Sequence, residues 1–184
     1  MKFQKLGIDG TWLVNSEQHY DDRGSFQEWF SFENIKENLG FDFHVAQANL
    51  SYSHKNALRG IHFSVAKTGQ AKLVTCVSGA ILDVIVDLRP NSETFGKWIS
   101  FELHSKTGTS ILIGEKLGHG FLALEDNSAV SYLITSKYSP DLEYSINPLD
   151  PVLAISWPSI NQIISEKDKF APSLTELIQK KVLI

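Results

Sequence analysis

Five side chains capable of acid–base chemistry fall in or beside apolar segments of this sequence: His62, Lys72, Asp83, His119 and Tyr132. Burying such groups costs on the order of several kcal/mol unless a partner or ligand compensates. Taken singly, each of these residues also has a purely structural interpretation. A histidine in a strand is more often a satisfied structural group, a lysine can extend to the rim of the barrel, and a tyrosine can pack as a core aromatic. Five titratable groups together in apolar surroundings indicate an active site.

Short strands separated by turn residues are expected to position these groups, from about Phe43 to Ser136. The segment Ala80–Leu88 predicts a strand buried on both faces, with Leu82, Val84, Val86 and Leu88 on one face and Ile81, Asp83, Ile85 and Asp87 on the other. Similar segments are Lys72–Val77, Trp98–Leu103, Ser110–Ile113, Gly120–Leu124 and Ala129–Ser136. Their spacing predicts an all-β sandwich or barrel.

Helices are expected only at the margins of the chain, over Ser31–Leu39 and Ser173–Val182, the second beginning with a capping-box pattern. No linker-like shift in composition interrupts the 184 residues, of which 42% are hydrophobic, so residues 1–184 are expected to form a single domain. In a jelly-roll barrel one strand face lines a tapering interior that can hold a ligand. The polar side chains on that face are therefore the candidates for function.

Composition excludes several classes of function. The formal net charge is −4 and the cations are scattered, so no basic stripe favours nucleic acid. No apolar run reaches the roughly 20 residues that a membrane helix needs, and MKFQKLGIDGTW lacks the apolar centre of a signal peptide. Cys76 is the only cysteine, which excludes an internal disulfide. We expect a cytoplasmic protein with neither a membrane nor a nucleic-acid partner.

A metal-dependent cupin oxygenase is one alternative. Metal-binding cupins carry two histidines separated by one residue, then a glutamate and a later histidine. Here Ser64 replaces the second histidine and no glutamate follows in register. His62 and His119 alone lack the ligands for a stable mononuclear site, so no metal is expected.

Several motifs in a fixed order resemble the dTDP-4-dehydrorhamnose 3,5-epimerase family over nearly the whole chain. They are DDRGSFQEWF, QANLSYS, ALRGIHF, GQAKLVTCVSGAILDVIVDLR, TFGKW, GHGFL, SYLITSKYSP and INPLDPVLAISWP. The resemblance implies a cupin-type jelly roll, a homodimer that exchanges N-terminal strands, and epimerisation of a dTDP-4-keto-6-deoxyhexose without metal or cofactor.

The resemblance also implies roles for individual residues. His62 falls on the family's base, Asp168 on the carboxylate that pairs with it, Tyr132 on the general acid and Lys72 on the residue facing the sugar ketone. Contacts to the nucleotide sugar are implied for Arg23, Glu28, Gln47, Asn49, Arg59, His119 and Glu143, for Tyr138 near the thymine, and for Lys167. Asp83 competes with Asp168 for His62, because it lies at an interior position of a strand whereas Asp168 follows in a segment expected to be a loop.

These roles suit inversion beside a ketone. Removal of the acidic hydrogen gives an enolate, which needs a base working near neutral pH and a cation at the ketone oxygen. Inversion then needs an acid on the opposite face of the ring. Two alternatives stay open: an epimerase acting only at C3 or only at C5, as the INPLDP segment suggests by its similarity to antibiotic-sugar relatives, and a catalytically silent cupin that binds nucleotide sugars.

Overall fold

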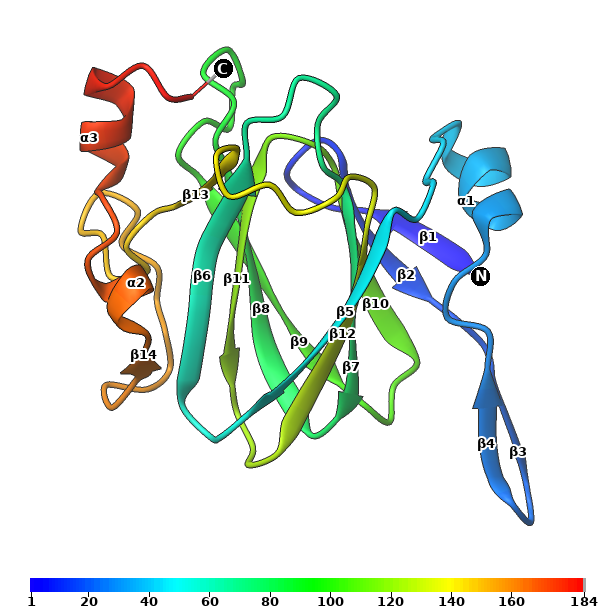
Figure 1. The fold of residues 1–184 in the computed structure, drawn as a ribbon. Coiled ribbons are helices and arrows are strands. Elements are labelled where there is room, and N and C mark those ends of the chain that lie inside the picture. The colour runs from blue at the N-terminus through cyan, green and yellow to red at the C-terminus, as the bar shows by residue number, and fades with distance from the viewer. Residues whose placement is uncertain (184) are drawn as a thin grey trace.

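The structure is a computed structural model that describes residues 1–183, and β-strands dominate it (Figure 1). One six-stranded sheet has the order β1-β2-β10-β7-β12-β5, and a second has the order β13-β6-β11-β8-β9 with β14 paired in parallel to β6. The strands of the first sheet are β1 (Lys2–Lys5), β2 (Thr11–Asn15), β5 (Gln47–Ser53), β7 (Lys72–Ser78), β10 (Thr109–Ile113) and β12 (Ser128–Ile134). Those of the second are β6 (Ala57–Ser64), β8 (Ala80–Asp87), β9 (Trp98–His104), β11 (Leu117–Ala123), β13 (Glu143–Ser145) and β14 (Ile163–Ile164).

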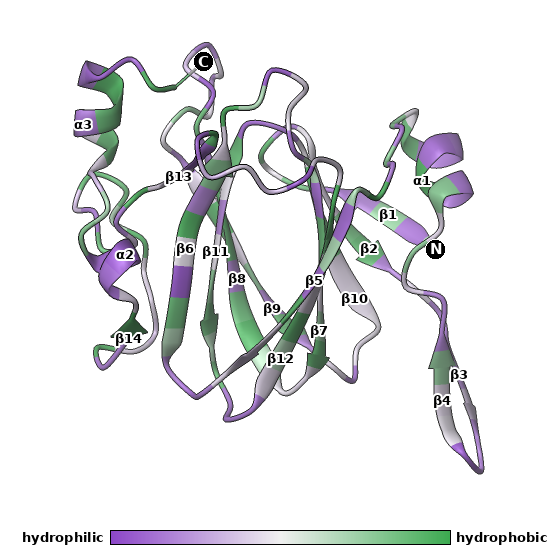
Figure 2. Cartoon of the chain, in the orientation of Figure 1, coloured by the Kyte–Doolittle hydropathy of each residue, from purple (hydrophilic) through white to green (hydrophobic). Residues whose placement is uncertain are grey.

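The two sheets face each other (Figure 1), and hydrophobic residues recur along their strands (Figure 2). A cluster of buried apolar side chains from both sheets packs between them. Strand β8 illustrates this packing. Ile81 and Ile85 point inward into this core, while Val84 and Val86 pack on the outer side against the C-terminal part of the chain. The strand is buried on both faces, as its sequence predicts. The predicted all-β jelly-roll architecture is confirmed.

Three short helices lie at the margins: α1 (Phe32–Leu39), α2 (Glu166–Lys169) and α3 (Leu174–Gln179). Ser173 accepts a hydrogen bond from the Glu176 backbone while the Glu176 side chain accepts one from Ser173, so the predicted capping box is present. Leu174 and Leu177 of α3 pack on the outer face of the second sheet. None of the helices within residues 1–183 is long and apolar enough to span a membrane.

The sequence prediction located the central strands within two or three residues but missed others. Strands β1 to β4, β13 and β14 lie outside the segment from Phe43 to Ser136 and have two to five residues each, too few for a clear alternation. The segment around Asp168 was expected to be a loop, which is wrong: it forms α2, with Ser165 as its N-cap. Helix α3 ends at Gln179 rather than Val182.

A separate hairpin of β3 (Gln18–Asp21) and β4 (Gly24–Gln27) extends away from both sheets (Figure 1). Most of its side chains are exposed, including Tyr20 and Phe26, each 70% exposed. The hairpin therefore contributes little to the apolar core of the chain.

Candidate active site

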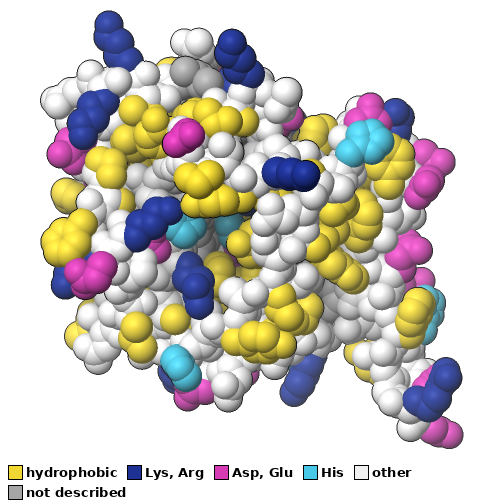
Figure 3. Space-filling view, in the orientation of Figure 1, with side chains coloured by type: hydrophobic (Ala, Val, Ile, Leu, Met, Phe, Trp, Pro, Cys, Tyr) yellow, Lys and Arg dark blue, Asp and Glu magenta, His cyan; other side chains and the backbone are white. Residues whose placement is uncertain are grey.

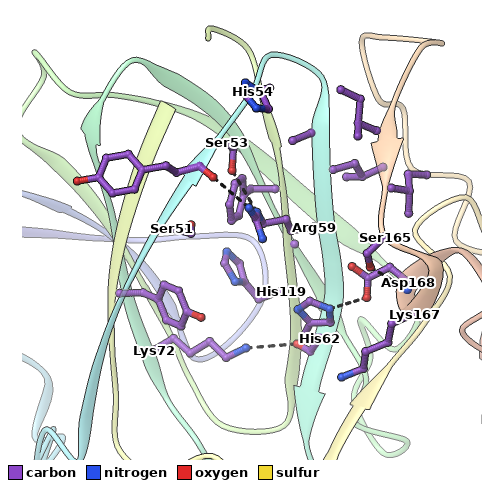
Figure 4. Close-up of a pocket in the computed structure, with 18 residues that line it drawn as sticks. Ser51, Ser53, His54, Arg59, His62, Lys72, His119, Ser165, Lys167 and Asp168 are labelled. Carbon is purple, nitrogen blue, oxygen red and sulfur yellow. Dashed lines mark hydrogen bonds and ion pairs between the residues drawn. The ribbon is translucent and has the colours of Figure 1, made fainter. Parts of the chain in front are cut away.

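A cavity of about 500 Å³ opens between the two sheets. In the space-filling view it is a hollow in the face of the molecule, with histidine side chains inside it and cationic side chains beside it (Figure 3). Strands of both sheets and the segment Ile163–Asp168 line it. Among its lining residues are His62, Lys72, His119, Tyr132 and Asp168 (Figure 4). The cavity therefore brings together groups that lie more than 100 positions apart in sequence.

His62 and Asp168 form a hydrogen-bonded pair at the side of this cavity. Nε2 of His62 lies 2.7 Å from Oδ1 of Asp168, and the two side chains are 40% and 5% exposed (Figure 4). Asp83 does not contact His62; its carboxylate is taken by another histidine. Of the two competing carboxylates, Asp168 is the partner of His62.

Local structure fixes Asp168 in place. Its backbone N–H donates to the Oγ of Ser165, the N-cap of α2, and its Oδ2 accepts from the backbone N–H of Gly60 at 3.3 Å. Gly60 has φ +117°, and a Cβ there would lie 2.5 Å from Cα of Gly120, so only glycine fits this close approach of β6 to β11. Burial acts to raise the pKa of Asp168, but the hydrogen bond and charge of His62 hold it below its usual value. The carboxylate therefore stays ionised beside the imidazole.

A second histidine–carboxylate pair lies beside the first. His119 on β11 is the direct cross-strand partner of His62 on β6, so both side chains share one face of the sheet. Nε2 of His119 lies 2.7 Å from Oδ2 of Asp83, whose side chain is fully buried. The cavity thus has two imidazoles, each held by its own carboxylate.

Lys72 enters the cavity from the facing sheet. It shares the inner face of β7 with Val74 and Cys76, and its Nζ donates to the backbone oxygen of His62 at 3.4 Å. Burial lowers the pKa of Lys72, while the negative charges of Glu143 and Asp83 act in the opposite direction. The amine of Lys72 is buried and donates this one long hydrogen bond to a carbonyl oxygen, so it is available to a ligand.

Tyr132 lies on β12, next to β7 in the same sheet as Lys72. Burial raises the pKa of the Tyr132 hydroxyl, whereas the charge of Arg59 acts to lower it. The hydroxyl therefore keeps its proton at neutral pH and can donate it. The arrangement offers an imidazole base on one sheet, with an acid and a cation on the sheet facing it.

Arg59 also lines the cavity, where its guanidinium donates to Oγ of Ser53 at 3.1 Å and to the backbone oxygen of Tyr52 at 3.1 Å. Lys167 lies on the other side, next to Asp168 (Figure 4). Together with His119 these side chains make this part of the cavity favourable for an anion.

A second cavity of about 250 Å³ adjoins the first, since Lys72 and Tyr132 line both. It is lined by the remaining implied contact residues of the core, Gln47, Asn49, Tyr138 and Glu143. Nε2 of Gln47 donates to Oδ1 of Asn49 at 2.7 Å, and the Tyr138 backbone donates to Oε1 of Gln47 at 3.1 Å. These hydrogen bonds hold the side chains of Gln47 and Asn49 in place at the second cavity.

Arg23 and Glu28 lie outside both cavities of this chain. Arg23 is in the turn of the β3–β4 hairpin, where its guanidinium pairs with Asp21 at 2.5 Å and is 90% exposed. Glu28 follows β4 and is also exposed. Within one chain, the expectation that these two residues join the site is not met.

Sequence reasoning missed several lining residues, among them Gln70, Ser51 and Ser53. One signal was present: the polar residues of QANLSYS alternate, which places Gln47, Asn49, Ser51 and Ser53 on one face of β5. Gln70, which donates to Glu143 at 2.9 Å, lies in a loop and has no such periodicity. Residues 1–183 contain no group of three or more histidine, cysteine or acidic side chains arranged to hold a metal ion.

Comparison with known proteins gives consistent matches along the chain. The family model described as dTDP-4-dehydrorhamnose 3,5-epimerase matches residues 5–176. A dTDP-4-dehydro-6-deoxyglucose 3-epimerase of a Streptomyces species is 45% identical over 170 residues, covering 92% of this chain and 87% of that protein.

Solved structures agree. The 4-keto-6-deoxy sugar epimerase of the novobiocin gene cluster of Streptomyces spheroides has a TM-score of 0.97 at 41% identity, covering 100% of this chain and 92% of that one. A 3′-monoepimerase from Streptomyces bikiniensis in complex with dTDP-quinovose has a TM-score of 0.93 at 42% identity, covering 97% and 90%.

Proposed function

The chain belongs to the dTDP-4-dehydrorhamnose 3,5-epimerase family, and we propose that it epimerises a dTDP-4-keto-6-deoxyhexose at C3, C5 or both, with His62 as base and Tyr132 as acid. One observation carries this proposal. His62 belongs to one sheet and Tyr132 to the sheet facing it, and both line the same cavity. A sugar ring lying between the sheets presents one face to each residue, as inversion requires.

Proton removal begins at His62. With Asp168 held at Nε2, the carboxylate accepts the N–H on that side and leaves Nδ1 free to act as the base. The ionised carboxylate then stabilises the imidazolium formed when the proton arrives. Lys72 directs its cation at the ketone oxygen and stabilises the enolate more than the ketone, which lowers the barrier.

Reprotonation comes from Tyr132 on the opposite face of the ring. Its hydroxyl is protonated at neutral pH because burial raises its pKa. Transfer of that proton to the enolate carbon inverts the centre, whereas return of the proton from His62 would restore it. The same pair serves C3 or C5, depending on which carbon the bound ring turns toward His62.

The nucleotide part of the ligand meets the polar walls of the two cavities. Arg59, His119 and Lys167 favour the diphosphate, because forked and cationic donors match phosphate oxygens. Gln47, Asn49 and Glu143 offer hydrogen bonds, and the exposed ring of Tyr138 offers a stacking face for thymine. No cofactor or metal enters this mechanism.

A homodimer accounts for the two residues that lie outside the cavities. Arg23 and Glu28 lie at the protruding hairpin, where aromatic side chains are also exposed. In the proposed dimer the hairpin of each protomer covers its partner and brings these residues to the partner's cavity. Light scattering at micromolar concentration tests this, and a monomer contradicts it. We place this one-domain enzyme in the cytoplasm, consistent with a single, free cysteine.

NMR of dTDP-4-keto-6-deoxyglucose in deuterated water distinguishes a 3,5-epimerase from a single-carbon epimerase and from a protein that binds nucleotide sugars without reaction. Deuterium at C3 and C5 supports a 3,5-epimerase, and deuterium at one carbon supports a single-carbon epimerase like the similar 3-epimerases. Binding without any exchange supports a silent nucleotide-sugar-binding protein. The epimerase proposal fails in that last case.

A further inference from the structure

Asp83 is a buried carboxylate in the middle of β8 that the proposed reaction does not use. Its side chain is 0% exposed, on the inner face of the second sheet beneath the cavity. Among the described residues, Oδ2 lies 2.7 Å from Nε2 of His119 while Oδ1 has no hydrogen-bond partner. A half-satisfied buried carboxylate is costly, so this one needs an explanation beyond packing.

We infer that Asp83 is a positioning residue for the proposed epimerase: its carboxylate orients the ring of His119 toward the ligand, and its negative charge acts on the buried Lys72 of the facing sheet. This inference rests on the proposed function. It extends that function by adding a residue that does not itself touch the reacting atoms.

The effect on His119 follows from its contacts. His119 is 9% exposed at its side chain and lines the cavity, and Asp83 is its recorded hydrogen-bond partner. Because the carboxylate accepts at Nε2, it fixes the ring rotation and leaves Nδ1 for a ligand. Without Asp83, rotation of the ring would be limited by packing alone.

The effect on Lys72 follows from charge. Lys72 is buried, and burial disfavours its cation. The titratable and charged groups that line the same cavities or act on it come from both sheets and from the segment at α2: His54, Arg59, His62, Asp83, His119, Tyr132, Glu143, Lys167 and Asp168. Two of these are carboxylates that favour the protonated amine, Glu143 and Asp83. Glu143 also lines the second cavity as a proposed ligand contact, whereas Asp83 is not used by the proposed reaction.

The test is the substitution Asp83→Asn, with the rate of deuterium incorporation measured across pH 6 to 10. Loss of the charge lets Lys72 lose its proton at lower pH, so the alkaline limb of kcat is expected to move to lower pH. Asp150→Asn is the matched control. Asp150 is equally buried but accepts from the backbone of Val152, Leu153 and Leu174, away from the cavity. That variant should lose stability while keeping the limb in place.

A purely structural role is recognised by an unmoved alkaline limb in Asp83→Asn, with activity falling only as far as folded protein is lost; this result overturns the inference. Nitrogen NMR of the His119 ring in the wild type provides a second measurement that needs no variant. A proton on Nε2 from pH 6 to 9 is expected, and a bare Nε2 facing Asp83 contradicts the proposal. The pH dependence of Asp83→Asn and the nitrogen NMR of His119 test this inference separately from the proposed function. The proposed function would instead be refuted if the wild type showed no exchange at C3 or C5.

Discussion

Replacing Asp168 by asparagine isolates the contribution of the His62–Asp168 pair. The substitution keeps the size of the side chain but removes the charge 2.7 Å from Nε2 of His62, and the one amide oxygen can accept from His62 or from Gly60 but not from both. Hydrogen bonds to charged groups contribute about 1.5–3 kcal/mol. Because the His62 side chain is 40% exposed, solvent screens the pair and the lower half of this range applies. A loss of about 1.5–2 kcal/mol corresponds to a fall in kcat of roughly 10- to 30-fold.

The assay is the initial rate of deuterium incorporation into dTDP-4-keto-6-deoxyglucose at pH 7.5, measured at several substrate concentrations. The fall is expected in kcat with little change in KM, because the pair acts when positive charge forms on the imidazole. Glu166→Gln is the matched control, since Glu166 is an exposed carboxylate in the same helix α2 and should behave as wild type. Wild-type kcat in a folded Asp168→Asn protein would show that the charge of Asp168 does not assist His62.

Three further substitutions test other parts of the site and fold. Lys72→Met should lower kcat by about 10²–10³, the effect of losing one stabilising group at an oxyanion; steady-state kinetics check this, and a change confined to KM contradicts it. Tyr132→Phe should let deuterium exchange continue while inversion slows, so an unchanged ratio of inverted to exchanged product speaks against the acid role. Asp87→Asn should lower the free energy of unfolding at pH 7 by about 3 kcal/mol, since it breaks a buried pair with Arg89 at 2.7 Å. Burial acts to raise the pKa of Asp87, but hydrogen bonds from Arg89, Ser92 and Thr94 hold it far below its usual value. The stabilisation by ionised Asp87 is therefore full above about pH 4 and is lost as the pH falls further. Equal denaturation curves for variant and wild type at pH 7 would contradict this prediction.

The sequence predicts the central strands well because each has strong apolar periodicity. Segments such as Ala80–Leu88 alternate two buried faces over eight or nine residues, a pattern that a helix would not produce. The short strands at either end of the chain have no comparable signal. The β3–β4 hairpin in particular is largely exposed, so hydrophobic burial leaves no pattern in its sequence.

The candidate site was found only in part, for a physical reason. Single residues on strands could be chosen as candidates for the site by their type and by the face on which they lie. Which distant residues form hydrogen-bonded pairs, however, depends on the register of the sheets. That Asp168 meets His62 while Asp83 meets His119 follows from the position of α2 beside β6 and from the pairing of β8 with β11. Neither relation is visible in a single sequence. The resemblance to a family pointed to Asp168, whereas strand parity alone favoured Asp83.

The central claim is that His62 removes a proton beside the ketone of a dTDP-linked sugar in this cavity. The most direct test is NMR of dTDP-4-keto-6-deoxyglucose in deuterated water with the wild type and with His62→Ala. With the wild type, deuterium is expected at C3, C5 or both, and the variant is expected to lose that exchange. Exchange at the wild-type rate in a folded His62→Ala protein would contradict it.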